Sequence, residues 1–395
     1  MNAAPETWLA ARERCHAQAL AAVGQPVASL ETPALVIDLD AMERNLQRMA
    51  SFARAHGLRL RPHAKTHKSA ELARQQMALG AVGVCVQKTD EALALAHAGV
   101  TDVYISNEVL AESKLARLAQ AVRELPCRFA LAVDSLLGIE RLAAALAQAR
   151  VEQAGAIDVF VEIDVGHGRC GASSPEEALL LAHQIQAHPT LRLAGLQAYH
   201  GGAQHLRTAH ERDTALAASA DAVRETMAQW QAAGLQVPLI TGAGTGTLVR
   251  EAGSGLWGEL QAGSYLFMDA DYAANEGDPG APVFEHALFV KAQVISRGAH
   301  HAVCDAGHKS HAIDSGLPTV ASPPGLQFAN GGDEHGLLRA AAPEQLPALG
   351  DTVWLVPGHC DPTVNLHDFY VGVRGGLAQG VIERIIPIDA RGAIR

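Results

Sequence analysis

Short apolar runs recur along the first two-thirds of the chain, and an alanine- and leucine-rich stretch follows most of them. Runs of this length, rich in β-branched residues and bounded by turn residues, predict buried strands. The stretches between them predict helices: Leu115, Leu118, Val122 and Leu125, for example, are spaced three and four apart along one face. The eight predicted strands are 59–65, 82–88, 102–107, 128–134, 157–164, 193–200, 238–245 and 259–265.

Eight alternations of strand and helix favour an α/β fold, a (β/α)₈ TIM-like barrel over residues 41–272, with a doubly wound open sheet as the alternative. After about residue 275 the pattern changes to strands separated by Gly, Pro and Asp turns. A ninth apolar run, 33–40, has no place in an eight-stranded barrel. We therefore predict a smaller, mostly-β domain built from residues 1–40 and 273–395.

Composition narrows the possible partners. Of the 395 residues, 31 are basic and 42 are acidic, for a net charge of −11, which argues against nucleic acid or an anionic membrane as the partner. The six cysteines are scattered without a C-x-x-C pair, as is typical of a reducing compartment. We find neither a secretory signal nor an apolar run of the roughly 18 residues a membrane span needs. A cytoplasmic protein is expected.

Polar residues mark the end of the first barrel strand. In "LRLRPHAKTHKSAE" Arg61, His63 and Lys65 alternate with smaller or apolar residues, and in a strand this period of two would place all three on one face. A solvated edge strand would show the same pattern. In a barrel, however, the reactive side chains sit at the carboxyl ends of strands. Lys65 there would be either an ion-pair member or a Schiff-base nucleophile with a pKa lowered by Arg61 and His63.

A glycine-rich segment follows the seventh strand. Three glycines in "TGAGTGT", 241–247, permit backbone amides to converge on a phosphate, although a plain tight turn has the same composition. Phosphate sites in such barrels lie after strands seven and eight, and Gly263, Ser264 and Tyr265 end the eighth strand. One lysine opposite one phosphate cradle fits pyridoxal 5′-phosphate.

Several motifs together resemble a known family. They are "RPHAKTHKS", "VEIDVGHGRCG", "LQAYHGGAQH", "TGAGTGT", "ELQAGSYLFMDADY", "DEHG" and "VPGHCDPTVNLHDFYVGVR". These are similar to the D-threonine aldolase and 3-hydroxy-D-aspartate aldolase group, pyridoxal-phosphate enzymes of the alanine-racemase-like fold type III. The resemblance implies a homodimer with an active site between barrel and β domain.

The resemblance also implies roles for individual residues. Lys65 would form the Schiff base, and Arg169 and Tyr199 would contact the cofactor ring. His205 would lie beside a metal and act as a catalytic base. The residues expected to hold the cofactor phosphate are Gly244, Thr245, Gly246, Ser264 and Tyr265.

The segment "PGHCDP" carries the expected metal pair. In an extended segment His359 and Asp361 point one way and Cys360 points away. One imidazole and one carboxylate suit Mn²⁺ or Mg²⁺, and Zn²⁺ less well, although H-x-D is also common in purely structural segments. The aspartate matches the aldolase form, whereas the dehydratase branch resembles H-x-C; which of Cys360 and Asp361 ligates stays open.

The resemblance predicts retro-aldol cleavage of a D-β-hydroxy-α-amino acid to glycine and an aldehyde, dependent on pyridoxal phosphate and a divalent metal. A D-serine or 3-hydroxyaspartate dehydratase on the same scaffold is the first alternative. A non-catalytic pyridoxal-phosphate-binding protein is the second. The sequence leaves open whether the substrate is D-threonine, a phenylserine or 3-hydroxy-D-aspartate.

Overall fold

The computed structural model describes residues 8–395, and the chain divides into two compact units. The barrel unit comprises residues 46–265, 272–283 and 392–395. The β unit comprises the described residues up to 45 together with 266–271 and 284–391. Within the described residues, no helix is long and apolar enough to cross a membrane.

Eight parallel strands form the sheet of the barrel unit, in the order β2-β9-β8-β7-β6-β5-β4-β3. Beyond β2, His63 forms a parallel bridge with Cys85 of β3, so the two ends of this order meet and the ring closes. This closure confirms the predicted barrel and excludes the open doubly wound sheet. The strands are β2 (Arg59–Leu60), β3 (Val84–Val86), β4 (Asp102–Ile105), β5 (Arg128–Val133), β6 (Ile157–Glu162), β7 (Leu191–Ala198), β8 (Ile240–Gly242) and β9 (Glu259–Leu260).

Alternation along each strand explains how the barrel is filled. Val103 and Ile105 belong to the large core between strands and helices, whereas Tyr104 between them joins a small inner cluster. Tyr104 packs there against Phe160 of β6, with ring centroids 4.8 Å apart. Because neighbouring side chains of a strand point to opposite faces, continuous apolar runs are required where both faces are buried.

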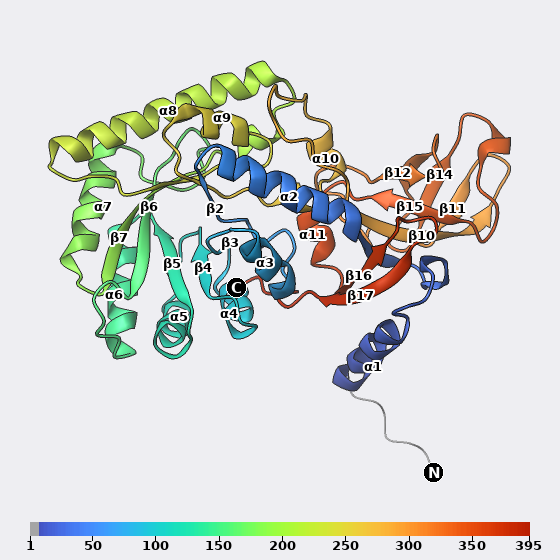
Figure 1. Cartoon of the computed structure of the whole chain (residues 1–395), viewed down its shortest axis with the longest axis horizontal. Coiled ribbons are helices and arrows are strands. Elements are labelled where there is room, and N and C mark those ends of the chain that lie inside the picture. Colours follow the sequence, from blue (N-terminus) through green and yellow to red (C-terminus); the bar gives the residue numbers. More distant parts are fainter. Residues whose placement is uncertain (1–7) are drawn as a thin grey trace, which may run out of the picture. The chain divides into compact units, whose positions relative to one another are not determined.

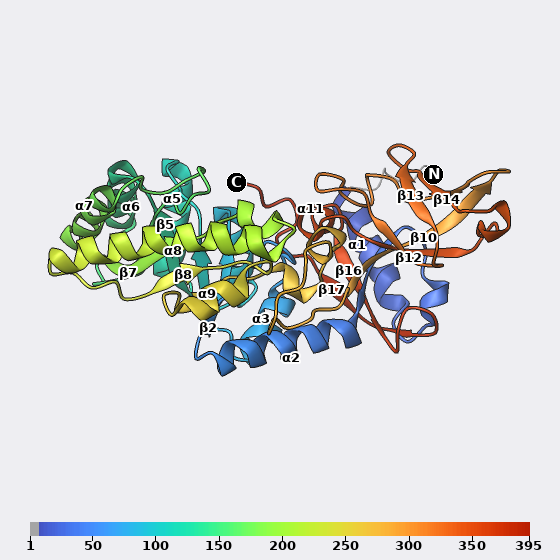
Figure 2. The ribbon, with the colours of Figure 1, turned by 90° about the horizontal axis from the view of Figure 1, so that it is seen from above.

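Helices cover the outside of this ring. Figures 1 and 2 show α5, α6 and α7 beside β4–β7, and the view of Figure 2 places α3 and α9 on another side of the strands. The helices that follow the strands are α3 (Ala70–Ala78), α4 (Thr89–His97), α5 (Glu112–Glu124), α6 (Leu136–Gln148), α7 (Pro175–Ala187), α8 (Ala209–Ala232) and α9 (Leu248–Ser254); α2 (Leu39–Ala55) precedes β2.

The β unit contains a nine-stranded, mostly antiparallel sheet, drawn largely in orange and red in Figure 1. Its member β1 (Ala34–Asp38) lies between β10 (Leu288–Arg297) and β16 (Phe369–Arg374), antiparallel to the first and parallel to the second. The prediction that an N-terminal strand joins the C-terminal β domain is therefore confirmed. The other strands are β11 (Ala302–Cys304), β12 (Thr319–Ser322), β13 (Gln327–Asn330), β14 (Gly336–Arg339), β15 (Thr352–Val356) and β17 (Val381–Pro387).

Shorter elements complete the chain. They are α1 (Trp8–Ala21), α10 (Ala270–Ala273), α11 (Cys360–Val364) and the 3₁₀ turns η1 (Val27–Ser29), η2 (Gly202–His205), η3 (Ser264–Leu266) and η4 (Pro343–Gln345).

Candidate active site

Lys65 lies just past the carboxyl end of β2, in a turn. It is the only partly exposed residue in the run 60–70, in which every other residue is buried. Its amide donates to Nδ1 of His63 at 3.5 Å. A lysine that alone reaches solvent from a buried segment is placed to react with a small molecule at the barrel mouth.

The predicted common face of Arg61, His63 and Lys65 is wrong, because the strand ends before Lys65. Arg61 is instead a buried structural residue. Its Nε donates to Glu259 at 3.0 Å and its Nη1 to Asp102 at 2.5 Å. These two carboxylates compensate its charge inside the barrel.

His63 lies directly beside the lysine turn. Its Nε2 lies 2.9 Å from Nε2 of Gln87 and 3.3 Å from the Ser106 hydroxyl. Burial, and then the positive charge of Lys65, hold the pKa of His63 well below its usual value. The imidazole is therefore neutral, and it packs against the lysine turn without adding a second charge.

The glycine-rich turn after β8 is held by side chains from other loops. Oε1 of Gln204 accepts from the Gly246 amide, and Oγ1 of Thr245 accepts from the Tyr265 amide, both at 3.0 Å. Tyr265 is buried, and its hydroxyl accepts from Gln76 at 3.1 Å. Gly246 and Tyr265 were predicted to contact the phosphate, but in this structure their amides donate to side chains that fix the shape of the loop.

Other donors at the same place fit an anionic group. The amides of Gly244 and Ser264 donate to no acceptor within the described part of the chain. Nor does the buried Thr66 hydroxyl have a partner there. A Cβ at Gly263 would lie 2.7 Å from that hydroxyl, so glycine is needed for the two loops to approach. Buried donors without acceptors are what a phosphate would satisfy, and the cofactor therefore fits this end of the barrel.

Arg169 and Tyr199 follow the adjacent strands β6 and β7. The Arg169 guanidinium lies 5.8 Å from the centroid of the Tyr199 ring and 3.9 Å from Glu162. The charge of Arg169 also contributes to the lowered pKa of His63. The structure thus brings the predicted cofactor-ring residues together with each other and within electrostatic reach of the lysine turn.

His205 ends the 3₁₀ turn η2 and is exposed. Its ring lies 5.7 Å from that of Tyr272, at an interplanar angle of 50°. Two residues separate this turn from Thr208, the N-cap of the 24-residue helix α8. His205 is therefore a solvent-facing imidazole on a well-anchored loop.

The predicted metal pair lies in the β unit. The expectation of an extended segment is wrong from Cys360 onward, because α11 begins there and His359 is its N-cap. Nδ1 of His359 nevertheless bonds Asp314 at 2.7 Å, which leaves Nε2 for a metal. Burial alone would lower the pKa of His359, but Asp361, Asp314 and Asp269 outweigh it and raise this pKa. Such a negative surrounding fits a divalent cation.

Cys360 is fully buried, and its thiol lies 3.4 Å from the Met268 carbonyl oxygen. Its amide donates to Asp269 at 3.0 Å. Burial raises the pKa of this thiol well above its usual value, and only the thiolate is a metal ligand. This environment favours Asp361 over Cys360 as the second ligand.

Comparison with known proteins identifies the family. The model "Alanine racemase, N-terminal domain" matches residues 37–271, and a serine dehydratase domain model matches residues 287–373. A D-threonine aldolase from Arthrobacter sp. is 45% identical over 94% of this chain and 96% of its own length. The chain belongs to the D-threonine aldolase and 3-hydroxy-D-aspartate aldolase group.

Two further members of the aldolase group are similar over nearly the whole length. A 3-hydroxy-D-aspartate aldolase from Paracoccus denitrificans is 40% identical over 93% of this chain and 94% of its own. The crystal structure of a D-threonine aldolase from Filomicrobium marinum superposes with a TM-score of 0.90, at 46% identity, covering 94% of this chain and 99% of that one. A D-threo-3-hydroxyaspartate dehydratase from Delftia sp. is more distant, at 34% identity over 85% of this chain and 92% of its own.

Some residues of this aldolase-group site were missed by sequence reasoning. Gln204 lies inside a recognised motif, yet nothing local shows that its carboxamide reaches Gly246. Asp314 lies 45 residues before His359, in a segment without a motif. Glu162 ends β6, two residues before the predicted end of that strand at Asp164, and the rule that reactive groups lie at strand ends would have pointed to this segment.

Glu162 belongs to a compact acidic group at the ends of β4, β5 and β6. Its side chain is only 4% exposed. Burial, and then the charge and hydrogen bond of Glu108, raise its pKa from 4.5 to about 9. Ligand atoms of Glu108, Asp134 and Cys170 lie within 4.8 Å of one another beside it. Two carboxyl groups in contact and out of water cannot both ionise, so Glu162 carries a proton at neutral pH.

Because Glu162 keeps its proton in the folded protein, we expect the free energy of unfolding to depend on pH. Above about pH 4.5 the unfolded chain has released it while the folded protein keeps it to about pH 9. The free energy of unfolding should therefore fall with rising pH across this window, by up to about 1.4 kcal/mol per pH unit for one such group. In urea titrations Glu162→Gln should lose less stability than the parent protein between pH 7.5 and 9.

Glu251 provides the matched control, since burial raises its pKa only to about 7. In Glu251→Gln the free energy of unfolding should fall less steeply with rising pH below pH 7, and as steeply as in the parent protein above pH 7.5. Equal slopes for the parent and Glu162→Gln above pH 7.5 would show that Glu162 is ionised in the folded protein.

Proposed function

We propose that this protein cleaves a D-β-hydroxy-α-amino acid of the D-threonine type to glycine and an aldehyde. The observation that carries the proposal is Lys65, partly exposed within an otherwise buried run at the end of the first barrel strand. A cradle of donors without acceptors lies at the carboxyl ends of the barrel strands as well. Lysine and cradle would hold pyridoxal phosphate by its two ends.

Pyridoxal phosphate supplies an electron sink for the broken carbon–carbon bond, and a divalent metal supplies Lewis acidity that lowers the pKa of a hydroxyl group. Lys65 would bind the cofactor covalently, and the Gly244 and Ser264 amides would hold its phosphate, with Thr245 and Gly246 shaping the loop. Arg169 and Tyr199 would orient its ring. The neutral His63 would add no second positive charge beside the lysine.

His359 and Asp361 would hold the metal, with Asp314 fixing the ring orientation of His359. One nitrogen and one oxygen ligand with open positions suit Mn²⁺ or Mg²⁺, and Zn²⁺ less well. A metal held by these two residues would have room for the substrate hydroxyl. His205 would accept the proton of that hydroxyl as cleavage begins.

We further infer a cytoplasmic homodimer. The six cysteines are all free thiols in the structure, which supports a reducing compartment. The dimer rests on the family resemblance alone, and sedimentation of the purified protein tests it directly.

His205→Ala separates two steps of the reaction. If His205 takes the β-hydroxyl proton, the variant should cleave D-threonine about 10² to 10⁴-fold more slowly, the usual cost of a lost general base. Exchange of the glycine α-proton should survive, because glycine has no β-hydroxyl. Both rates are measured on one preparation by proton NMR in heavy water. Equal losses in cleavage and exchange would reduce His205 to a support of its loop.

A substrate panel tests the function as a whole. The purified protein, with pyridoxal phosphate and Mn²⁺, should convert D-threonine, D-phenylserine or 3-hydroxy-D-aspartate and leave the L-enantiomers untouched. A chelator should stop conversion, and added metal should restore it. Turnover of L-threonine at a comparable rate would contradict the proposed stereochemistry.

A further inference from the structure

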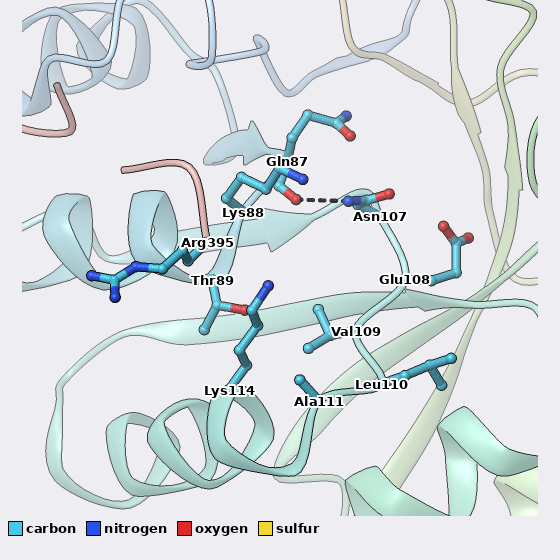
Figure 3. Close-up of a pocket in the computed structure, with 10 residues that line it drawn as sticks. All are labelled: Gln87, Lys88, Thr89, Asn107, Glu108, Val109, Leu110, Ala111, Lys114 and Arg395. Atoms are coloured by element: carbon cyan, nitrogen blue, oxygen red, sulfur yellow. Dashed lines mark hydrogen bonds between the residues drawn. The ribbon is translucent and has the colours of Figure 1, made fainter. Parts of the chain in front are cut away.

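A small cavity lies beside the barrel mouth, where the loops after β3 and β4 meet. Its volume is about 70 Å³, and its lining includes Lys88, Thr89, Asn107 and Lys114 (Figure 3). None of these residues belongs to the cofactor or metal groups described above. The cavity is therefore a feature that the proposed cleavage does not use.

Thr89 presents a buried hydroxyl to this cavity. The residue is 1% exposed, and its Oγ1 has no hydrogen-bond partner within residues 8–395. Figure 3 shows that oxygen turned toward the end of the Lys114 side chain. An unpaired buried hydroxyl destabilises a fold unless a bound molecule completes its hydrogen bond.

Lys88 and Lys114 supply two positive charges without a counter-charge. Both side chains are partly buried, and neither forms an ion pair or hydrogen bond with another described residue. The neighbouring Lys68, by contrast, pairs with buried Glu91. In a chain of net charge −11, two adjacent unpaired lysines mark a local preference for an anion.

The remaining charges around the cavity leave this preference in place. Glu108 is the one acidic lining residue, and Figure 3 shows its carboxylate directed away from Lys88 and Lys114. Asp90 is engaged by Arg117 at 2.5 Å and by Arg395 at 3.3 Å. Lys88 is also the N-cap of the nine-residue helix α4. Its amide donates to the Glu91 carboxylate and the Asp90 amide donates to the Arg395 main-chain oxygen, so the donors offered to an anion are side chains and not this helix end.

We propose that the cavity binds a phosphate group, held by the ammonium groups of Lys88 and Lys114 and by the Thr89 hydroxyl. A compact anion with several acceptor oxygens could accept from both ammonium groups and from the hydroxyl at once. The cavity admits a phosphate-sized group and no extended molecule, so its source is inorganic phosphate or the end of a phosphate monoester. This proposal is independent of the cleavage reaction.

Isothermal titration of the holoenzyme with inorganic phosphate tests the site, since bound cofactor already fills the other phosphate cradle. We expect a Kd at or below about 1 mM that weakens with added salt. Lys114→Ala and Thr89→Val should each weaken binding about tenfold or more, the loss of one charge-assisted contact. Lys309→Ala, which removes a lysine paired with Asp333 and Glu334 elsewhere, should not.

Thermal unfolding adds a signature that a structural role would not give. In phosphate-free buffer Thr89→Val should be at least as stable as the parent, because an unpaired hydroxyl is removed. In saturating phosphate this order of stability should reverse.

Titration with phosphoserine in place of inorganic phosphate identifies the source of the phosphate group. An affinity equal to that for inorganic phosphate indicates a monoester as the ligand, and weaker binding indicates the free ion. Absence of phosphate binding, or binding unchanged in both variants, overturns the proposal.

Discussion

Lys65→Ala should lose cleavage of D-threonine by about 10⁴-fold or more, since the side chain would serve both as the covalent anchor and as a proton carrier. The loss should appear at saturating cofactor, because the phosphate cradle still binds. Lys65→Arg is the matched control: it keeps the positive charge but cannot form the covalent bond, and it should be equally inactive. Recovery of activity in Lys65→Arg would reduce the lysine to an electrostatic role.

Reductive labelling locates the lysine without relying on activity. Borohydride treatment of the holoenzyme should fix the cofactor on a single peptide that contains Lys65. Lys68 and Lys88 are the nearest competitors in sequence, but Lys68 is buried in its pair with Glu91 and Lys88 lines the separate small cavity. A label on either of them would contradict the placement of the active site.

His359→Ala and Asp361→Ala should each abolish metal-dependent cleavage and lower Mn²⁺ affinity by about 100-fold or more, beyond the 10- to 100-fold typical of a lost outer-shell partner. The cofactor absorbance should stay unchanged, because the metal would act on the substrate hydroxyl. Free Mn²⁺, counted by its electron paramagnetic resonance signal, gives the affinity directly.

Cys360→Ala is the neighbouring control for the metal pair. Its thiol is buried against the Met268 carbonyl, so the variant should keep both metal affinity and cleavage. Loss of metal from Cys360→Ala alone would move the site to the H-x-C type and reopen the dehydratase alternative.

The architecture could be predicted because barrel strands leave a strong local signal. Tyr104 and its neighbours Val103 and Ile105 are all apolar, as a strand buried on both faces requires. The run 33–40 was assigned correctly by counting, since a ring of eight strands has no place for a ninth. These inferences use only the periodicity of apolar residues and the number of predicted strands, and both can be read from the sequence.

The site geometry was less predictable, because it depends on where each strand stops. The alternation of Arg61, His63 and Lys65 suggested one shared face, yet the chain turns after His63. Likewise α11 begins at Cys360, where an extended segment was expected. The direction of these side chains depends on one or two residues at the end of an element, and the boundaries of helices and strands are the least certain part of a prediction from sequence patterns.

Long-range partners were beyond reach of the sequence. Gln204 shapes the turn at Gly246, and Asp314 orients His359 across 45 residues. Each contact forms only when the chain has folded, so no rule about residue spacing predicts it. The proton on Glu162 has the same origin, since only the folded barrel brings Glu108 against it.

The most direct test of the account is the product mixture formed from D-threonine by the purified protein with pyridoxal phosphate and Mn²⁺. Proton NMR of one reaction shows glycine, acetaldehyde and 2-oxobutanoate together, and ammonia is assayed on the same sample. Cleavage predicts glycine and acetaldehyde in equal amounts, with no ammonia released. A mixture of 2-oxobutanoate and ammonia would contradict retro-aldol cleavage and assign the scaffold to dehydration.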